Sequence, residues 1–186
     1  MEIYTLTLLG VFVVIFMASQ GGHDQMLVAN LSAKLGAGPG LVLASAIATC
    51  ISTGAWCWLG LLASAELGDP YLPYVITFAI ILAAVLLVLP VRLTPIKEPT
   101  RSVGAITIVL TMRQLFDAAR LLTFAAFAYA TASAFLAAAA FSGSMLALAL
   151  GMAKGTTLQH WPYWVLLRLA LAIMLLVGAM FIAFKG

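Results

Sequence analysis

The chain has 186 residues, of which 65 % are hydrophobic and 8 % are charged, and its formal net charge is +3. Globular domains carry about 25 % charged residues, so this composition excludes a soluble domain, and its abundant apolar surface excludes a disordered chain. The nine basic residues form no soluble basic patch, so nucleic-acid binding is not expected. We therefore expect a polytopic membrane protein whose first partner is the lipid bilayer, with room for about six spans of ~20 residues.

The first predicted span is interrupted by a short polar segment. An apolar run from residue 3 to residue 19 meets Gln20, two glycines and three further polar residues, and then continues to residue 35. One straight helix of that length is longer than a bilayer core needs, and the adjacent Gly21 and Gly22 favour a break or a kink. Three spans are thus predicted in this half, over residues 3–35, 41–65 and 71–90.

A charge-rich segment over 92–120 separates these spans from the rest of the chain. It holds five of the nine basic residues, so the positive-inside rule predicts that it lies in the cytoplasm. Its apolar stretch, 103–116, predicts an interfacial amphipathic helix, and the alternative is a seventh span. Arg113, Asp117 and Arg120 follow at helical spacings and predict a solvated face of that helix.

The remaining residues predict three further spans separated by a Ser-Gly-Ser turn at 142–144 and an aromatic interfacial turn. These spans cover residues 121–141, 145–158 and 163–184. Three spans on each side of a cytoplasmic linker place the two halves in opposite orientations, as in the inverted repeats of many secondary transporters.

The predicted fold is therefore an all-α polytopic integral membrane protein with six transmembrane helices arranged as two inverted three-helix repeats. Residues 1–91 form the first repeat, 92–120 form the basic cytoplasmic linker, and 121–186 form the second repeat. The distribution of Lys and Arg predicts that both termini lie outside the cytoplasm. We expect the chain in a bacterial inner (cell) membrane.

Two stripes of small residues at four-residue spacing predict close contacts between helices. The first is a stripe of alanines that is expected to form a packing seam: Ala126, Ala130, Ala134 and Ala138. The second is a stripe of hydroxyl side chains that predicts either a packing seam or a polar path: Ser45, Thr49 and Thr53.

Polar side chains at the break of the first span are the first candidates for chemistry. Gln20, His23, Asp24 and Gln25 interrupt an otherwise apolar run. An ionisable group at membrane depth is costly and indicates a functional site, and oxygen and imidazole donors at a broken helix suit a divalent cation or a proton. The alternative is an interfacial turn wetted by lipid headgroups. Arg168 in the last span is expected either to snorkel to the interface or to pair with Asp24.

Common enzyme signatures are absent from the sequence. It contains no glycine-rich phosphate loop, no His-Glu-x-x-His helix and no Gly-x-Ser-x-Gly elbow. We therefore expect no enzyme activity and no cofactor.

The order of these features resembles the small two-repeat cation/proton exchanger family, which includes the Golgi manganese/calcium exchangers and bacterial manganese exporters. Its members carry the signature Glu-x-Gly-Asp-Lys-Thr/Ser once in each half. Here residues 20–25 read Gln-Gly-Gly-His-Asp-Gln, with Gln20 at the Glu position and Gly22 at the Gly position. In the second half residues 126–131 take the place of the signature, and Thr131 matches its last position.

The resemblance implies a six-span fold in which side chains of both repeats meet at the midplane to bind a cation. The expected function is that of a divergent manganese- or calcium-like cation/proton exchanger. The alternative is a non-transporting accessory or assembly subunit that keeps the fold and has other membrane subunits as partners. The candidate residues of the ion or proton site are Gln20, His23, Asp24, Gln25 and Thr131.

Overall fold

The computed structural model describes residues 2–68, 70–91, 102–130, 133–155, 157 and 163–185. Over these ranges the chain forms eight α-helices, and the predicted all-α fold is confirmed. In chain order they are α1 (Glu2–Ser19), α2 (His23–Leu35), α3 (Pro39–Glu66), α4 (Leu72–Val88), α5 (Val103–Leu115), α6 (Ala118–Tyr129), α7 (Ala134–Lys154) and α8 (Tyr163–Lys185).

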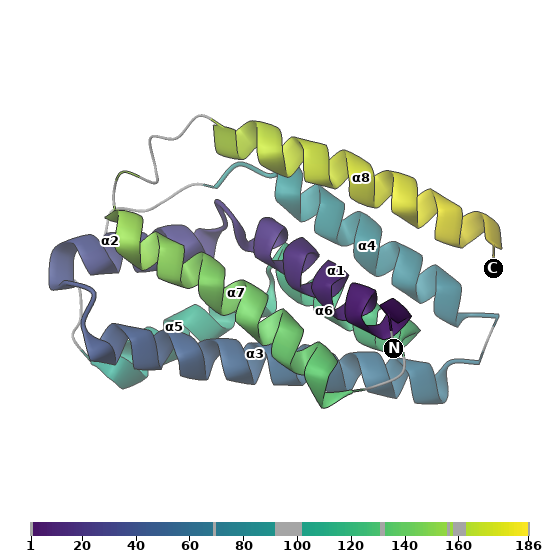
Figure 1. The fold of residues 1–186 in the computed structure, drawn as a ribbon, viewed down its shortest axis with the longest axis horizontal. Helices are drawn as coiled ribbons and strands as arrows, with labels where there is room; N and C mark the ends of the chain where they lie inside the picture. Colours follow the sequence, from purple (N-terminus) through teal and green to yellow (C-terminus); the bar gives the residue numbers. More distant parts are fainter. Residues whose placement is uncertain are drawn as a thin grey trace.

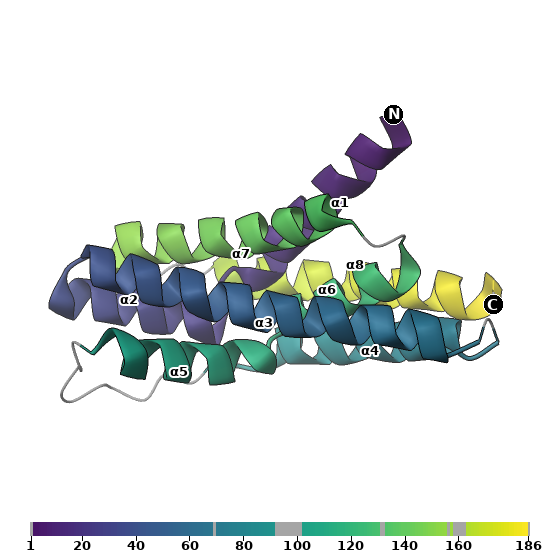
Figure 2. The ribbon, with the colours of Figure 1, turned by 90° about the horizontal axis from the view of Figure 1, so that it is seen from below.

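The helices run lengthwise along one elongated bundle (Figure 1). Helices α4 and α8 pack side by side along one edge, and α3 lies along the other edge against α5 and α6. Between these edges α1 and α2 follow one another along α7. The two termini lie toward the same end of the bundle, and the first turns of α1 rise away from the other helices (Figure 2).

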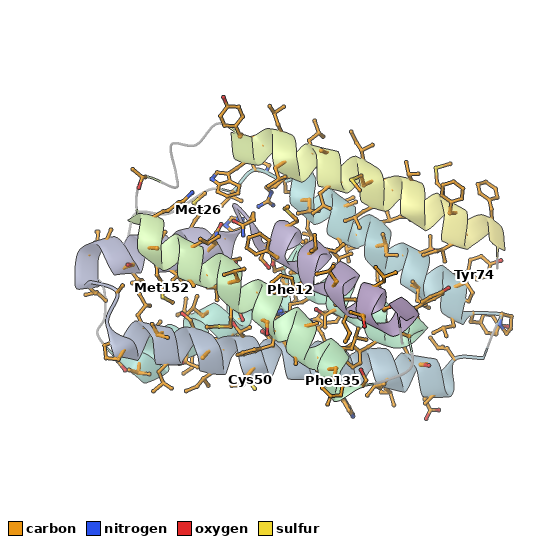
Figure 3. The ribbon with its side chains drawn as sticks, in the orientation of Figure 1. Phe12, Met26, Cys50, Tyr74, Phe135 and Met152 are labelled. Atoms are coloured by element: carbon orange, nitrogen blue, oxygen red, sulfur yellow. The ribbon has the colours of Figure 1, made fainter. Side chains whose placement is uncertain are left out.

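Three helices of the described ranges are long and apolar enough to cross a membrane, namely α3, α7 and α8. The pair α1–α2 meets the same criteria as one broken span, with a bend of 65°. Large apolar side chains such as Tyr74 and Phe135 point outward (Figure 3), and apolar residues also cover the outer face of α8. Such a surface is compatible with a membrane protein and unusual for a soluble one.

The predicted break of the first span is confirmed. Helix α1 ends at Ser19, and α2 begins at His23. Between them Gly21 has a φ of +65°, which is a left-handed conformation that side chains disfavour. A Cβ on Gly21 would also lie 3.3 Å from Cβ of Trp164, so glycine serves both the turn and the close approach of α8.

In the second half the span predicted over 163–184 is present as α8, but the bounds predicted for the two helices before it are wrong. The helix expected over 121–141 ends at Tyr129, and α7 continues through the turn expected at 142–144. Gly143 lies in the middle of α7, where a Cβ would stand 2.7 Å from the carbonyl oxygen of Phe12. The Ser-Gly-Ser triplet therefore belongs to a close helix contact between α7 and α1.

The predicted alanine seam is also wrong. Its four residues do not lie on one helix, because α6 ends before Ala130 and α7 starts at Ala134. Ala134 and Ala138 are exposed. The hydroxyl stripe of α3, in contrast, is buried: Ser45, Thr49 and Thr53.

The helix predicted over 103–116 is present as α5, and it packs along α3 with Ile106 and Leu110 buried. After the two residues Phe116 and Asp117, the chain continues as α6 along the same helix α3. Helices α5 and α6 thus form a second interrupted rod in the bundle.

Two apolar clusters fill the two ends of the bundle interior. One cluster joins α1, α4, α6, α7 and α8 around residues such as Ile15, Leu87 and Leu122. The other joins α2, α3, α5 and α7 around residues such as Val28 and Leu110. The residues between these clusters are polar and buried, so the interior contains a polar layer enclosed by apolar packing on both sides.

Candidate functional site

The break between α1 and α2 supplies the first part of the polar layer. The Nε2 of Gln25 donates to Oε1 of Gln20 at 3.0 Å and to the carbonyl of Ala147 on α7 at 2.7 Å, and Oε1 of Gln25 accepts from the amide of Gly21 at 2.7 Å. Asp24 is 3 % exposed, and one of its oxygens accepts from the amide of Gln25 at 2.8 Å. These bonds fix the bend and hold the Asp24 carboxylate at the start of α2.

The break between α5 and α6 supplies the second part. Asp117 is the N-cap residue of α6 and is half-buried. Arg120, three residues farther on, is 1 % exposed and donates from Nε to Oγ of Ser52 and from NH1 to Oγ of Ser144, each at 2.9 Å. A third, longer bond of 3.4 Å joins its NH2 to Oε1 of Gln114. Arg120 therefore connects α6 to α3, α7 and α5.

The hydroxyls of α3 complete the network around Gln114. Ser52 donates to Oε1 of Gln114 at 2.7 Å, and Nε2 of Gln114 donates to Oγ1 of Thr49 at 3.1 Å. Gln114, Ser52 and Thr49 are fully buried. Satisfied networks of this kind hold a single arrangement, because breaking one bond leaves buried polar groups without partners.

The two breaks meet at Gly22, the N-cap residue of α2. A Cβ on Gly22 would lie 2.9 Å from Oδ1 of Asp24 and 3.8 Å from Oδ1 of Asp117, so both carboxylates flank this glycine. Their charges repel one another, and both are attracted by Arg120 and Arg168. The amino-terminal ends of α2 and α6 add partial positive charge at the same place.

Arg168 of α8 lies beside this centre and binds only backbone in the described contacts. Its guanidinium donates to the carbonyls of Gly21 at 2.7 Å, Leu86 at 3.1 Å and Leu87 at 2.9 Å. It is 8 % exposed, so the expected snorkelling to the interface is not what the structure shows. Arg168 instead ties the first break to the last turn of α4.

Comparison with protein-family models, with curated proteins and with solved structures finds no match for this chain. The chemistry of the site therefore has to be argued from its own residues.

The structure brings together three of the five predicted site residues. Gln20, Asp24 and Gln25 are buried side by side at the first break. His23 is exposed and lies apart from the buried network. Thr131 lies outside the described residues.

Two of the central residues lie in a different environment from the one that the sequence predicts. Asp117 and Arg120 were expected on a solvated helix face, but they face the interior, and only Arg113 of that trio is exposed.

The centre contains two carboxylates and two guanidinium groups, so its ionised side chains balance one another. Within the described residues no group of three or more His, Cys, Asp and Glu side chains could hold a metal ion. A cation bound here would use Asp24 and Asp117 together with neutral amide and hydroxyl oxygens. Hard cations such as Ca²⁺ accept such mixed oxygen sets, although they prefer several carboxylates.

Three buried polar atoms next to this network have no hydrogen-bond partner: Nε2 of Gln20, Oγ of Ser45 and Oγ1 of Thr53. Each unpaired buried group costs about 1–3 kcal/mol. The two hydroxyl oxygens can bind water or a cation, whereas Nε2 of Gln20 can only donate, for example to water. Ser45 and Thr53 belong to the hydroxyl stripe of α3.

A cleft of about 360 Å³ approaches the site from the side of α4 and α8. Met26 and Trp164 pack together in it, with Met26 near the first turns of α8 (Figure 3). The cleft reaches the first break itself, because its lining includes Gly21 and Arg168.

Proposed function

We propose that the chain is a membrane transporter of the cation/proton exchanger type, with Asp24 and Asp117 as its central carboxylate pair. The observation that supports this proposal is that an oxygen of each carboxylate lies within 4 Å of the position that a Cβ on Gly22 would take, where two interrupted helices meet. Interrupted helices that direct their ends at a buried charged site are typical of secondary transporters.

The proposal includes a six-span arrangement in two inverted halves, with each interrupted rod counted as one span. The rod α1–α2 packs along α7, and the rod α5–α6 packs along α3 in the same way. Gln25 and Arg120 hold equivalent positions, since each is the third residue after the N-cap of its helix and each binds the partner half. On this proposal the second half begins with α5, and the cytoplasmic linker is confined to the residues before it.

Exchange chemistry follows from the carboxylate pair. Two neighbouring carboxylates repel one another, so the pair takes up a proton or a metal cation more readily than an isolated carboxylate does, and the two cations compete for it. This competition couples the movement of the metal cation to the movement of the proton if the site faces only one side of the membrane at a time. Among the described residues the cleft beside α8 offers an approach to the site, and the buried hydroxyl stripe of α3 continues from the site along α3.

Flux measurements in reconstituted vesicles test the proposal. Vesicles loaded with a pH indicator are given an inward gradient of Mn²⁺ or Ca²⁺, and proton release is recorded together with metal uptake. The wild-type chain should couple the two fluxes, and Asp24→Asn and Asp117→Asn should each abolish the coupling. Glu66→Gln is the matched control, because it makes the same change of carboxylate to amide at an exposed position at the end of α3.

A non-transporting accessory subunit is the second candidate. The observation that favours it is the presence of Arg120 and Arg168, whose charges balance both carboxylates without any bound ion. A wild-type chain that folds in vesicles and moves neither Mn²⁺, Ca²⁺ nor protons would support this candidate and refute the exchanger.

A further inference from the structure

The surroundings of Arg120 resemble the coordination shell of a metal ion more than an ordinary ion pair. Its guanidinium donates to three neutral oxygens, which come from three different helices: Oγ of Ser52, Oγ of Ser144 and Oε1 of Gln114. Hydroxyl and amide oxygens of this kind, completed by carboxylates, are the ligands of hard cations. We call these three oxygens the oxygen cage.

Both carboxylates of the site act on the same guanidinium. Asp24 and Asp117 attract the charge of Arg120, and the side chain is withdrawn from solvent. A buried cation of this kind is tolerated only when its charge is compensated and its donors are bonded. Arg120 meets both conditions with the groups that a bound metal ion would otherwise use.

We propose that Arg120 is a tethered cation that occupies the ion position of the site and competes there with a metal cation. In this arrangement its guanidinium fills the oxygen cage whenever no metal is bound and, together with Arg168, balances the charge of the two carboxylates. A metal cation binds only when the guanidinium moves out of the cage. The inference deepens the proposed function, but it concerns binding and can hold even where no flux occurs.

Two other residues near the carboxylates differ from Arg120 in their charge or in their hydrogen bonds. The equivalent residue of the first half is Gln25, which is neutral and bonds to Gln20 and to a backbone carbonyl. Arg168 carries the same charge near the same carboxylates, but its hydrogen bonds go to backbone carbonyls at helix ends. Arg168 therefore lies outside the oxygen cage. Its substitution serves as the control that shows whether the loss of any positive charge near the carboxylates changes metal binding in the same way.

A tethered cation has a direct effect on the exchange cycle. Without Arg120, Arg168 would balance only one of the two carboxylates of an empty site, and the remaining charge in a low-dielectric interior would oppose any rearrangement that carries the pair across the bundle. Arg120 removes that charge imbalance, so the site can be reoriented without a bound metal. It also weakens metal binding and favours release.

Binding of Mn²⁺ to the purified full chain in detergent tests the inference by titration calorimetry. Wild type and Arg120→Lys should bind weakly, whereas Arg120→Gln and Arg120→Met should bind at least about tenfold more tightly, because a like charge at close range is removed. Arg168→Gln should change the affinity much less. Adding Asp117→Asn to Arg120→Gln should remove the gain, and methylguanidinium should compete with Mn²⁺ in Arg120→Gln alone.

Three results would overturn the inference. They are tight Mn²⁺ binding by the wild-type chain, equal gains for Arg168→Gln and Arg120→Gln, and no gain in a neutral variant that still elutes as a folded species. The wild-type titration keeps the inference testable if the neutral variants fail to fold. If Arg120→Gln gains affinity while no variant shows flux, the tethered cation stands and the transport function fails.

Discussion

Alanine substitutions at glycines on two faces of the bundle should have opposite effects on stability. At Gly143 an added Cβ would lie 2.7 Å from the carbonyl oxygen of Phe12 and 3.1 Å from the amide nitrogen of Phe16. At Gly60 it would lie 2.7 Å from the carbonyl oxygen of Phe124. At Gly54 nothing lies within 4 Å. The first two sites are thus limited by the backbone of a neighbouring helix, and the third is open.

The magnitudes follow from two opposing terms. Alanine in a helix interior is favoured over glycine by about 1 kcal/mol, and this gain applies at all three sites. Ordinary contacts of a Cβ are 3.4–4 Å, so at Gly60 and Gly143 whole helices must separate. Overpacking of this kind costs about 1–3 kcal/mol, and the close contacts here with backbone atoms belong to the upper part of that range. The net change is a gain for Gly54→Ala and a loss of about 1–2 kcal/mol for the other two.

Thermal unfolding in detergent, followed by tryptophan fluorescence, measures these differences. For a chain of this length each kcal/mol corresponds to about 2–4 °C in Tm. Gly54→Ala should raise Tm by about that amount, and Gly60→Ala and Gly143→Ala should lower it by at least as much. Equal Tm values for Gly54→Ala and Gly143→Ala would show that α7 and α1 do not pack as closely as described.

Two further predictions concern the polar layer and the orientation of the chain. Ser52→Ala removes the hydroxyl that accepts from Arg120 and donates to Gln114. It should lower the free energy of unfolding by about 1–3 kcal/mol, because a buried guanidinium nitrogen loses its partner, and an unchanged Tm would argue against this network. In a chain without native cysteines, Gly68→Cys should react with an impermeant maleimide from outside intact cells and Lys97→Cys should not. The reverse labelling pattern would invert the proposed orientation.

The part of the site that the sequence analysis predicted depends on local information. Two adjacent glycines inside an apolar run indicate a break in the helix without any knowledge of the tertiary structure. The polar side chains beside them need hydrogen-bond partners wherever the segment lies in the membrane. Gln20, Asp24 and Gln25 were found in this way, and they are buried together. His23 belongs to the same segment, but its side chain is exposed at the start of α2. The direction in which it points is set by the bend between α1 and α2.

The second half was harder to predict because its signals resemble those of a surface segment. Asp117 and Arg120 follow a basic linker, and charge near a linker normally indicates a solvated helix face. The burial of Arg120 depends on α3, which contributes Ser52 from a distant part of the sequence. Gly143 was misread for a related reason, since glycine between two serines indicates a turn unless another backbone passes within contact distance.

The bonds of Arg168 have a consequence for the order in which the chain acquires its structure. The carbonyls of Gly21, Leu86 and Leu87 lie where α1 and α4 end, and the α-helical pattern leaves such groups without partners. Their donor comes from α8, which is synthesised long after both helices. Until α8 inserts, these carbonyls lack this hydrogen-bond donor within the apolar interior. Helices α1 to α4 therefore cannot reach the free energy of their final packed arrangement without α8. The structure around the first break is therefore complete only once α8 is in place.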